Sequence, residues 1–291
     1  MENNILEIQN LTKYYGNVKG VKNLSLQLHR GEIFGFIGPN GAGKSTTIRS
    51  IMNLINKTSG KVLIDGQIFT KDDKKIKEKI GYLPSKINLY DDLTVKEMLD
   101  YHESFYGNEV HQRREELVER LELDEKKKIE DLSLGNLKKL GIILALAHNP
   151  KLLILDEPTS GLDPIMQNVF YELLKEEKKK GNTIFYSTHI LNEVSKICDR
   201  VGIIKNGELI KVENVEDLPK KSLTFVTITS SQLDEIIQSL GVNIISKNEN
   251  TMKFANTIPH DELIKKLSKF SIERILIEEA TLEDMFLHYY R

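Results

Sequence analysis

Residues 38–46, GPNGAGKST, hold three glycines, one lysine and two hydroxyl side chains within nine positions. They satisfy the pattern G-x-x-x-x-G-K-[ST], whose glycines let backbone amides turn towards phosphate groups at the N-terminus of a helix. The pattern predicts that Lys44 reaches the β- and γ-phosphates of a nucleotide, that Ser45 binds Mg²⁺ and that Thr46 reaches the α-phosphate. A chance glycine-rich turn is disfavoured, because a buried strand precedes the stretch and a helical pattern follows it. The predicted phosphate-binding residues are Gly38, Pro39, Asn40, Gly41, Ala42, Gly43, Lys44, Ser45 and Thr46.

A pair of adjacent carboxylates forms the second candidate for chemistry, in LLILDEP at 152–158. Four apolar residues bring Asp156 to the C-terminal end of a strand, where parallel sheets bind their ligands, and we expect it to hold Mg²⁺ directly or through water. Glu157 is the candidate general base that polarises an attacking water. Alone at a strand end it would be read as a solvated carboxylate, but its place directly after Asp156 favours the catalytic interpretation.

Two further stretches could contact phosphate. His189 follows the buried strand TIFYST at the same expected sheet edge, so we predict that it contacts the γ-phosphate and positions the water, although a lone histidine is more often structural. In LSLGN, at 132–136, Ser133 and the amide of Gly135 open a long helix, which is a candidate anion site. The alternative for Ser133 is a plain N-cap of that helix.

The surrounding pattern predicts the elements that position these residues. Apolar residues at 48, 51, 52 and 55 follow the spacing of a helix after the strand EIFGFIG, and Asp163-Pro164 is a typical helix start before a second amphipathic helix. Strands that are apolar at consecutive positions and alternate with helices indicate a parallel α/β sheet. Thr94 and Glu97 have capping-box spacing and begin a helical unit that runs to about residue 121.

We therefore expect an ATPase domain at 1–211, with a helical subdomain inserted at about 85–148. Residues 212–222 are expected to form a linker, and 223–291 to form a small α+β domain. Its predicted order is strand 223–228, helix 233–240, strand 242–247, strand 251–255, helix 261–270 and strand 272–278, followed by a last helix with Leu282, Met285, Phe286 and Tyr289 on one face. The order β-α-β-β-α-β is that of ferredoxin-like domains.

Composition limits the function classes. The net charge of −2 gives no general attraction to nucleic acid or anionic lipid, and lysine-rich stretches such as KDDKKIKEK and KEEKKK alternate with acids and are read as solvated helix faces. The single cysteine, Cys198, allows neither an intrachain disulfide nor a cysteine-based metal site. No signal peptide and no apolar run of membrane-spanning length is visible, so a role at a membrane would be exerted through a partner.

Together these motifs resemble one family, the ATP-binding subunits of ATP-binding-cassette (ABC) transporters, over about residues 5–209. GPNGAGKST is similar to the family's phosphate loop, LLILDEPTSGLD to its second nucleotide motif with the dimer-loop Asp163, STH to its switch histidine, and LSLGN to its signature. The resemblance implies that Tyr15 stacks on adenine. It also implies that two cassettes pack head to tail, with Ser133, Gly135 and Asn136 on the partner's ATP, so that dimerisation depends on ATP.

The chain departs from the family pattern in two places. Leu134 and Asn136 replace a glycine and a glutamine of the usual signature, while Ser133 and Gly135 remain. Ser85 stands where the family has Gln or Glu contacting Mg²⁺ and water. Two outcomes stay open: a water or Lys86 takes over that contact, or the site hydrolyses ATP slowly.

The ending TLEDMFLHYY resembles that of single-cassette bacterial exporters that act with a separate, ABC-2-like membrane permease. The resemblance implies a peripheral protein at the cytoplasmic face of the membrane, whose transported molecules in relatives include antimicrobial peptides. Two alternatives stay open: a soluble ABC ATPase acting on DNA or ribosomes, and a kinase or GTP switch with the same phosphate loop. The first lacks its usual basic arm here, and the second lacks a guanine-reading N-K-x-D motif.

Overall fold

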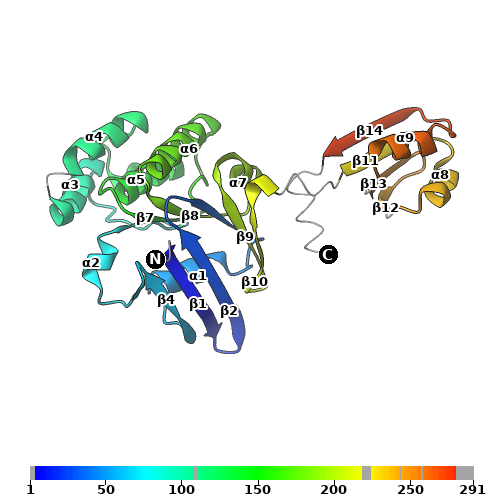
Figure 1. The fold of residues 1–291 in the computed structure, drawn as a ribbon. Helices are drawn as coiled ribbons and strands as arrows, with labels where there is room; N and C mark the ends of the chain where they lie inside the picture. Colours follow the sequence, from blue (N-terminus) through cyan, green and yellow to red (C-terminus); the bar gives the residue numbers. More distant parts are fainter. Residues whose placement is uncertain (1–3, 108–109, 218–223, 243, 257, 280–291) are drawn as a thin grey trace. The chain divides into compact units, whose positions relative to one another are not determined.

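The computed structural model describes residues 4–107, 110–217, 224–242, 244–256 and 258–279. The chain forms two compact units, Met1–Asn214 and Val215–Arg291 (Figure 1), each described below by itself. The last helix predicted from the sequence, with Leu282 to Tyr289, lies outside the described residues.

A six-stranded sheet forms the centre of the first unit. Its strand order is β10-β9-β3-β8-β7-β6, and all neighbours are parallel except the antiparallel pair of β9 and β10. Every residue of β3, β7 and β8 is buried, as expected for strands covered on both faces. The bounds are β3 Ile33–Ile37, β6 Ile80–Leu83, β7 Leu152–Asp156, β8 Thr183–Thr188, β9 Arg200–Lys205 and β10 Glu208–Asn214.

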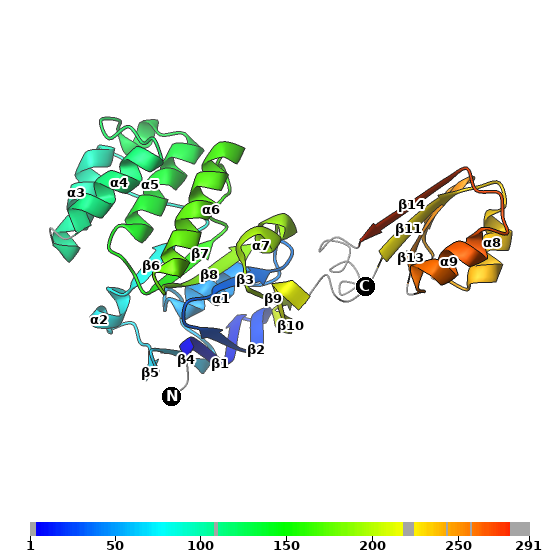
Figure 2. The same cartoon turned by 45° about the horizontal axis from the view of Figure 1, so that its top comes forward.

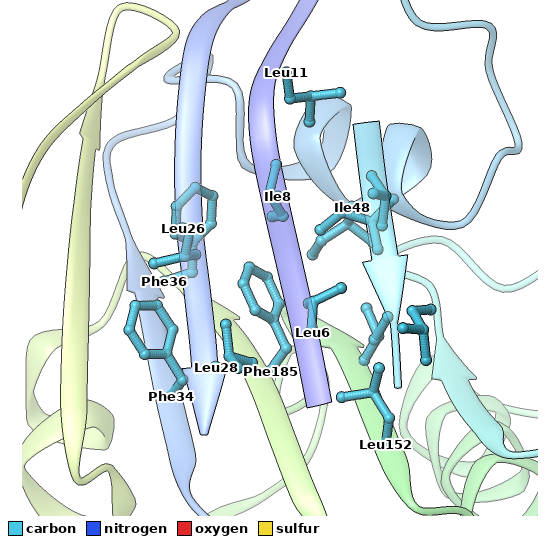
Figure 3. Close-up of a cluster of buried hydrophobic side chains, with 14 of the residues drawn as sticks. Leu6, Ile8, Leu11, Leu26, Leu28, Phe34, Phe36, Ile48, Leu152 and Phe185 are labelled. Carbon is cyan, nitrogen blue, oxygen red and sulfur yellow. The ribbon is translucent and has the colours of Figure 1, made fainter. Parts of the chain in front are cut away.

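A second, antiparallel sheet with the order β2-β1-β4-β5 packs on the first through an apolar layer. Leu6 and Ile8 on β1, Ile48 on α1, and Phe36 and Phe185 on the central sheet all belong to this cluster of buried side chains (Figure 3). Helix α1 is thereby fixed between the sheets, directly after strand β3. The bounds are β1 Asn4–Tyr15, β2 Val18–His29, β4 Ser59–Ile64, β5 Gln67–Ile68 and α1 Lys44–Ile51.

Helices α3, α4 and α5 gather at one end of the unit (Figure 2), in the region where a helical subdomain is predicted. The predicted capping box is present at the start of α3, where the Thr94 hydroxyl accepts from the Glu97 amide and the Glu97 carboxylate accepts from the Thr94 amide. The helix bounds of this unit are α2 Lys74–Lys77, α3 Val95–Tyr106, α4 His111–Arg120, α5 Leu134–Leu146, α6 Pro164–Lys179 and α7 Leu191–Ile197, with short 3₁₀ turns at Ile129–Asp131 and, at the start of the second unit, Val215–Asp217.

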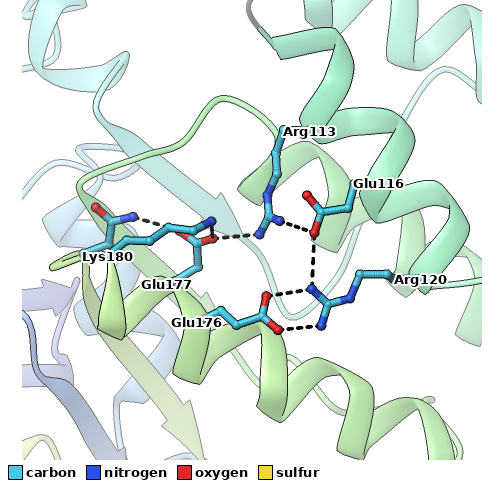
Figure 4. A network of polar contacts seen from close by, with 7 residues as sticks. Arg113, Glu116, Arg120, Glu176, Glu177 and Lys180 are labelled. Carbon is cyan, nitrogen blue, oxygen red and sulfur yellow. Dashed lines mark hydrogen bonds and ion pairs between the residues drawn. The ribbon is translucent and has the colours of Figure 1, made fainter.

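A polar network joins α4 to α6 (Figure 4). Glu177, which is 0% exposed, accepts hydrogen bonds of 2.8 Å from Arg113, Lys180 and Asn182. Beside it, Arg120 pairs with Glu176 through both terminal nitrogens. The interpretation of KEEKKK as a solvated helix face is therefore wrong at Glu177, because α4 covers that side of the helix.

The second unit has the predicted β-α-β-β-α-β order. Its antiparallel sheet has the strand order β12-β13-β11-β14, and its two helices pack on the sheet through a core of their own that includes Val226, Ile236, Phe254 and Leu263. The bounds are β11 Thr224–Thr229, α8 Leu233–Leu240, β12 Ile244–Lys247, β13 Thr251–Asn256, α9 His260–Leu267 and β14 Arg274–Glu279.

Two boundaries differ from the sequence prediction. Helix α1 ends at Ile51 and does not include Met52 and Ile55, because Asn53 adopts a left-handed conformation and the Leu54 amide turns back to the Arg49 carbonyl. Strand β10 continues to Asn214 in register with β9, so the first three residues of the predicted linker belong to the sheet. None of the helices described here has the length and apolarity required to span a membrane.

Candidate functional site

The phosphate loop connects β3 to α1 through a backbone that only glycine permits at two positions. A Cβ atom at Gly38 would lie 2.4 Å from the carbonyl oxygen of Ile204, and Gly43 has a φ of 108°. Gly43 is also the N-cap of α1, so no side chain occupies the first amides of the helix. These amides form the kind of anion site that a phosphate binds. Ser45 and Thr46 lie in this first turn, both half-buried.

Lys44 is 5% exposed, and its ammonium lies at the centre of the site. It donates hydrogen bonds to the carbonyl oxygens of Gly38 at 2.8 Å and Pro39 at 3.2 Å. The same nitrogen is 3.5 Å from Oε1 of Glu157. The structure thus brings the phosphate loop and the end of β7 together, although β8 lies between β3 and β7 in the sheet.

The carboxyl ends of β7 and β8 supply the remaining groups. Asp156 is 1% exposed and accepts a hydrogen bond of 2.6 Å from the Ser187 hydroxyl. Oε1 of Glu157 is 3.3 Å from Nδ1 of His189. Ser187 is the residue that the sequence interpretation missed here, although it stands in the quoted STH motif and the sheet register pairs it with Asp156.

The residues at this edge suit Mg²⁺. Asp156 forms no ion pair with any residue that the structure describes, and a buried carboxylate of this kind is costly unless a cation is supplied. The serine hydroxyl of Ser45 and the Asp156 carboxylate are hard oxygen donors, and Mg²⁺ in nucleotide sites commonly takes one or two such ligands beside phosphate and water. No cluster of three or more His, Cys, Asp or Glu side chains that could hold a metal occurs within the described ranges.

Tyr15, the predicted adenine platform, lies next to the phosphate loop. It is 45% exposed at the end of β1, and a Cβ at Gly20 would lie 3.0 Å from both the Tyr15 ring and the Thr46 methyl group. Lys13 Nζ is 4.8 Å from the centre of the ring. The ring is therefore both accessible and close to the helix that would hold the phosphates.

The signature stretch lies at the N-terminus of α5. Ser133 caps this helix by accepting from the Asn136 amide at 3.3 Å, so its plain N-cap role is present. Gly135 packs closely on the loop after Glu157, because a Cβ there would lie 2.8 Å from the Gly161 carbonyl oxygen. Among the described residues no hydrogen bond joins Ser133, Gly135 or Asn136 to the phosphate loop. Asp163 caps α6 by accepting from the amides of Ile165 and Met166.

Ser85, the departure from the family pattern, follows β6, which pairs with β7. Its carbonyl oxygen accepts a hydrogen bond of 3.2 Å from Nζ of Lys138 on α5, and the Glu157 carbonyl accepts from the same nitrogen at 3.3 Å. Burial lowers the pKa of Lys138, while the charges of Asp156 and Glu157 act in the opposite direction. Lys86, which the sequence suggested as a substitute, is exposed. Lys138 was not singled out from the sequence.

The pKa of the Tyr82 phenol, on β6, is also changed by its surroundings at this edge of the sheet. Burial, followed by the charge of Asp156, raises its pKa to about 12, so the phenol remains protonated at neutral pH.

Comparisons with known proteins show the family to which the chain belongs. The family model for ABC transporters matches residues 21–160. The linearmycin resistance ATP-binding protein LnrL of Bacillus subtilis is 37% identical over 303 residues, which cover 98% of this chain and 97% of that protein. The bacitracin transport ATP-binding protein BcrA of Bacillus licheniformis is 35% identical, with 97% of this chain and 96% of that protein covered.

Among solved structures, the dimeric post-hydrolysis state of the ATP-binding cassette MJ0796 with ADP and Pi superposes with a TM-score of 0.65 and 29% identity. It covers 72% of this chain and 98% of that cassette. Fold, motifs and whole-length relatives thus agree, and neither the kinase or GTP-switch alternative nor the soluble DNA- or ribosome-directed alternative gains support. The chain belongs to the ABC transporter family, as an ATP-binding subunit that hydrolyses ATP to drive transport.

Proposed function

We propose that this chain powers an exporter in which two cassettes close head to tail on ATP and move a separate integral membrane permease from its cytoplasmic face. The observation that carries the proposal is the convergence of Lys44, Glu157 and His189 within 3.5 Å contacts at the edge of the sheet. A cation for phosphate, a carboxylate base and a histidine at one point are the groups that phosphoryl transfer to water requires.

Each residue then has a defined task. Lys44 binds the β- and γ-phosphates. Because the Lys44 charge then pairs with the phosphates, Glu157 is free to polarise the attacking water. His189 holds the Glu157 carboxylate through Nδ1 and contacts the γ-phosphate. Ser45 and Asp156 would hold Mg²⁺, which neutralises charge on the phosphate oxygens when bound.

The signature residues act on the nucleotide of the second cassette. Ser133 is exposed at the start of α5, and the amides of this first turn and the helix dipole favour an anion in front of it. Because the signature has no bond to its own phosphate loop among the described residues, a partner's γ-phosphate is the ligand that this arrangement suits. Asp163, at the start of α6, would line the same interface, and the partner is an identical or a related cassette.

An aromatic groove on the helical subdomain is the surface that we assign to the permease. Tyr90, Tyr101 and Phe105 are 58%, 45% and 64% exposed, and their rings contact each other edge to face. A cavity of about 400 Å³ lies between Tyr90, Tyr101 and the acidic side chains of Asp92 and Glu97. Exposed aromatic rings bordered by acids suit a short amphipathic helix with a basic residue.

The transported molecules are proposed from the relatives. Bacitracin and linearmycin appear in the names of BcrA and LnrL, which this chain resembles over nearly its whole length. We infer that peptides or other antimicrobials are the class exported. Residues 223–291 are proposed to form an accessory domain, which either stabilises the subunit or contacts the permease.

The test of this function uses the purified full chain and its Glu157→Gln variant. The variant should bind Mg·ATP as wild type does and form an ATP-dependent dimer, visible by size exclusion with ATP in the buffer, while its turnover falls by roughly a hundredfold or more. Wild-type turnover in the variant would show that Glu157 is not the base. A hydrolysis rate per molecule that does not change with protein concentration would contradict the dimer.

A further inference from the structure

Lys138 is a buried cation that the proposed mechanism does not use. It is 1% exposed, and its Nζ donates to the carbonyl oxygens of Ser85 at 3.2 Å and Glu157 at 3.3 Å. Within the part of the chain that the structure describes, no carboxylate lies within ion-pairing distance of this nitrogen. Burial of this ammonium opposes folding, and the nearby charges of Asp156 and Glu157 offset the cost only in part, so stability alone does not explain its presence.

The residue that Lys138 contacts has an unusual backbone. Glu157 has a φ of 48°, in the left-handed region that residues with a side chain rarely adopt. Such a conformation persists only where the surroundings determine it, and it is frequent at active sites. Here the Glu157 amide donates to the Ser187 carbonyl at 3.1 Å, and its carbonyl accepts from Lys138 at 3.3 Å and, within the following turn, from the Ser160 amide at 3.3 Å. Both sides of the residue are therefore held, one by β8 and one by α5.

The conformation of Glu157 decides where its carboxylate lies. With this backbone, Oε1 is 3.5 Å from Lys44 and 3.3 Å from His189. If the residue relaxed to an ordinary φ, its side chain would leave that position. The hydrogen bond from Lys138 is thus connected to the geometry of the reaction through a single residue.

Lys138 also joins segments that are distant in the sequence. It lies five residues after Ser133, the N-cap of the same helix, and its second acceptor, Ser85, stands at the position where the family has a longer polar side chain. In this chain the link from that segment to the catalytic carboxylate runs through the Ser85 carbonyl and the Lys138 ammonium. A long side chain at position 85 is not needed for this link.

We propose that Lys138 is a positioning residue for ATP hydrolysis, which holds the backbone of Glu157 in its left-handed conformation and ties it to Ser85 and to the signature helix. The proposal rests on the role of Glu157 given under the proposed function. Through this contact, a movement of α5 when Ser133 and Gly135 engage a partner's nucleotide would be transmitted to the catalytic carboxylate of the same chain.

The test compares steady-state hydrolysis by the full chain in wild type, Lys138→Met, Lys138→Arg and the control Lys139→Met. Lys139 is on the same helix, half-buried, and its replacement removes the same charge. We expect kcat to fall at least about tenfold in Lys138→Met, while the affinity for a fluorescent ATP analogue with Mg²⁺ stays within about threefold of wild type. Lys138→Arg, which keeps a cation and several donors, should retain more activity than the methionine variant, and Lys139→Met should stay within about twofold of wild type.

Thermal unfolding of each variant separates positioning from folding. A merely structural role would lower the melting temperature and nucleotide affinity together, with the arginine variant no better than the methionine variant. That pattern, or a kcat for folded Lys138→Met within about twofold of wild type, overturns the proposal. Should the methionine variant not fold, Lys138→Gln is judged by the same thresholds. Wild-type turnover in Glu157→Gln would overturn the assignment of the base and this proposal together. Wild-type turnover in Lys138→Met beside an inactive Glu157→Gln would overturn this proposal alone, so the two failures are distinguishable.

Discussion

The hydroxyl of Ser187 donates a hydrogen bond of 2.6 Å to Oδ1 of Asp156, and both side chains are almost completely buried at the ends of adjacent strands. Strands β7 and β8 place the two residues opposite each other in register. The bond fixes the orientation of the carboxylate that we assign to Mg²⁺. Supporting hydrogen bonds of this kind commonly matter nearly as much as the ligands themselves.

We predict that Ser187→Ala weakens the magnesium site without unfolding the protein. A hydrogen bond to a charged group contributes about 1.5–3 kcal/mol, so kcat/KM should fall roughly tenfold or more and half-maximal activity should require more Mg²⁺. ATPase assays over a magnesium titration measure both effects. Ser195→Ala is the matched control, because Ser195 is exposed on α7 and its hydroxyl donates to the Leu191 carbonyl of the same helix. Equal magnesium requirements in the two variants would contradict the role given to Ser187.

A second prediction concerns the buried network between α4 and α6. Removing one member of a buried, hydrogen-bonded pair leaves the other charge unpaired and costs about 3–5 kcal/mol. Arg113, only 8% exposed, keeps the partly exposed Glu116 as a second charged partner, so Glu177→Gln should lower the unfolding free energy by less than this, about 2 kcal/mol. Replacing Arg113 and Glu177 together by Met should recover much of that loss.

Denaturant unfolding measures these changes as shifts in the midpoint. Glu172→Gln is the control on the same helix, where the pair with Lys175 is exposed, and its effect should stay below about 0.5 kcal/mol. A Glu177→Gln variant as stable as this control would mean that the network adds little to the attachment of the helical subdomain.

How far the sequence predicts the site depends on the distance over which each contact acts. Lys44, Ser45 and the caps at Thr94 and Asp163 depend on neighbours within a few residues, so their patterns are visible in the sequence. The structure has both caps as predicted and begins α1 at Lys44. Lys138 is different. A lysine on a helix is usually a surface residue, and its acceptors stand 53 and 19 positions away, so nothing local marks it as buried.

The same reason explains the misread charge run at 175–180. Its alternating charges look like a solvated face, and only the approach of α4 buries Glu177. In the second unit the amphipathic pattern predicted the order of the elements correctly, and α8 has the predicted bounds, whereas β14 begins two residues later than predicted. Strand ends depend on pairing partners, which are not local in the sequence.

A third prediction follows from His102 on α3, whose ring lies 5.5 Å from that of His148 and 4.9 Å from that of Tyr106. Burial, together with the charge of His148, lowers the pKa of His102 to about 4. Between pH 6.5 and 4 the unfolded chain therefore binds a proton that the folded chain does not. Stability is fully present above pH 6.5 and is lost as the pH falls towards 4, by about 2 kcal/mol between pH 7.5 and pH 5.

His102→Phe should reduce this acid sensitivity, since a ring of similar size stays buried without the proton. Unfolding midpoints at pH 7.5 and pH 5 measure the difference for wild type and variant. His148, whose pKa burial also lowers, contributes with the same sign, so part of the sensitivity should remain. His29→Phe, at an exposed histidine, is the control. The prediction fails if the stability of His102→Phe falls between the two pH values as steeply as that of wild type.

The last prediction concerns the independence of the two units. Their buried apolar clusters have no residue in common, and every residue assigned to the nucleotide lies within the first unit. A chain ending at Ser222 should therefore fold and bind Mg·ATP with about the affinity of the full protein, and its basal kcat should stay within about threefold. Circular dichroism and ATPase assays check this, with Glu157→Gln in the truncated chain as the inactive control. A folded fragment that no longer binds ATP would mean that residues 223–291 complete the site, and would exclude a purely accessory role.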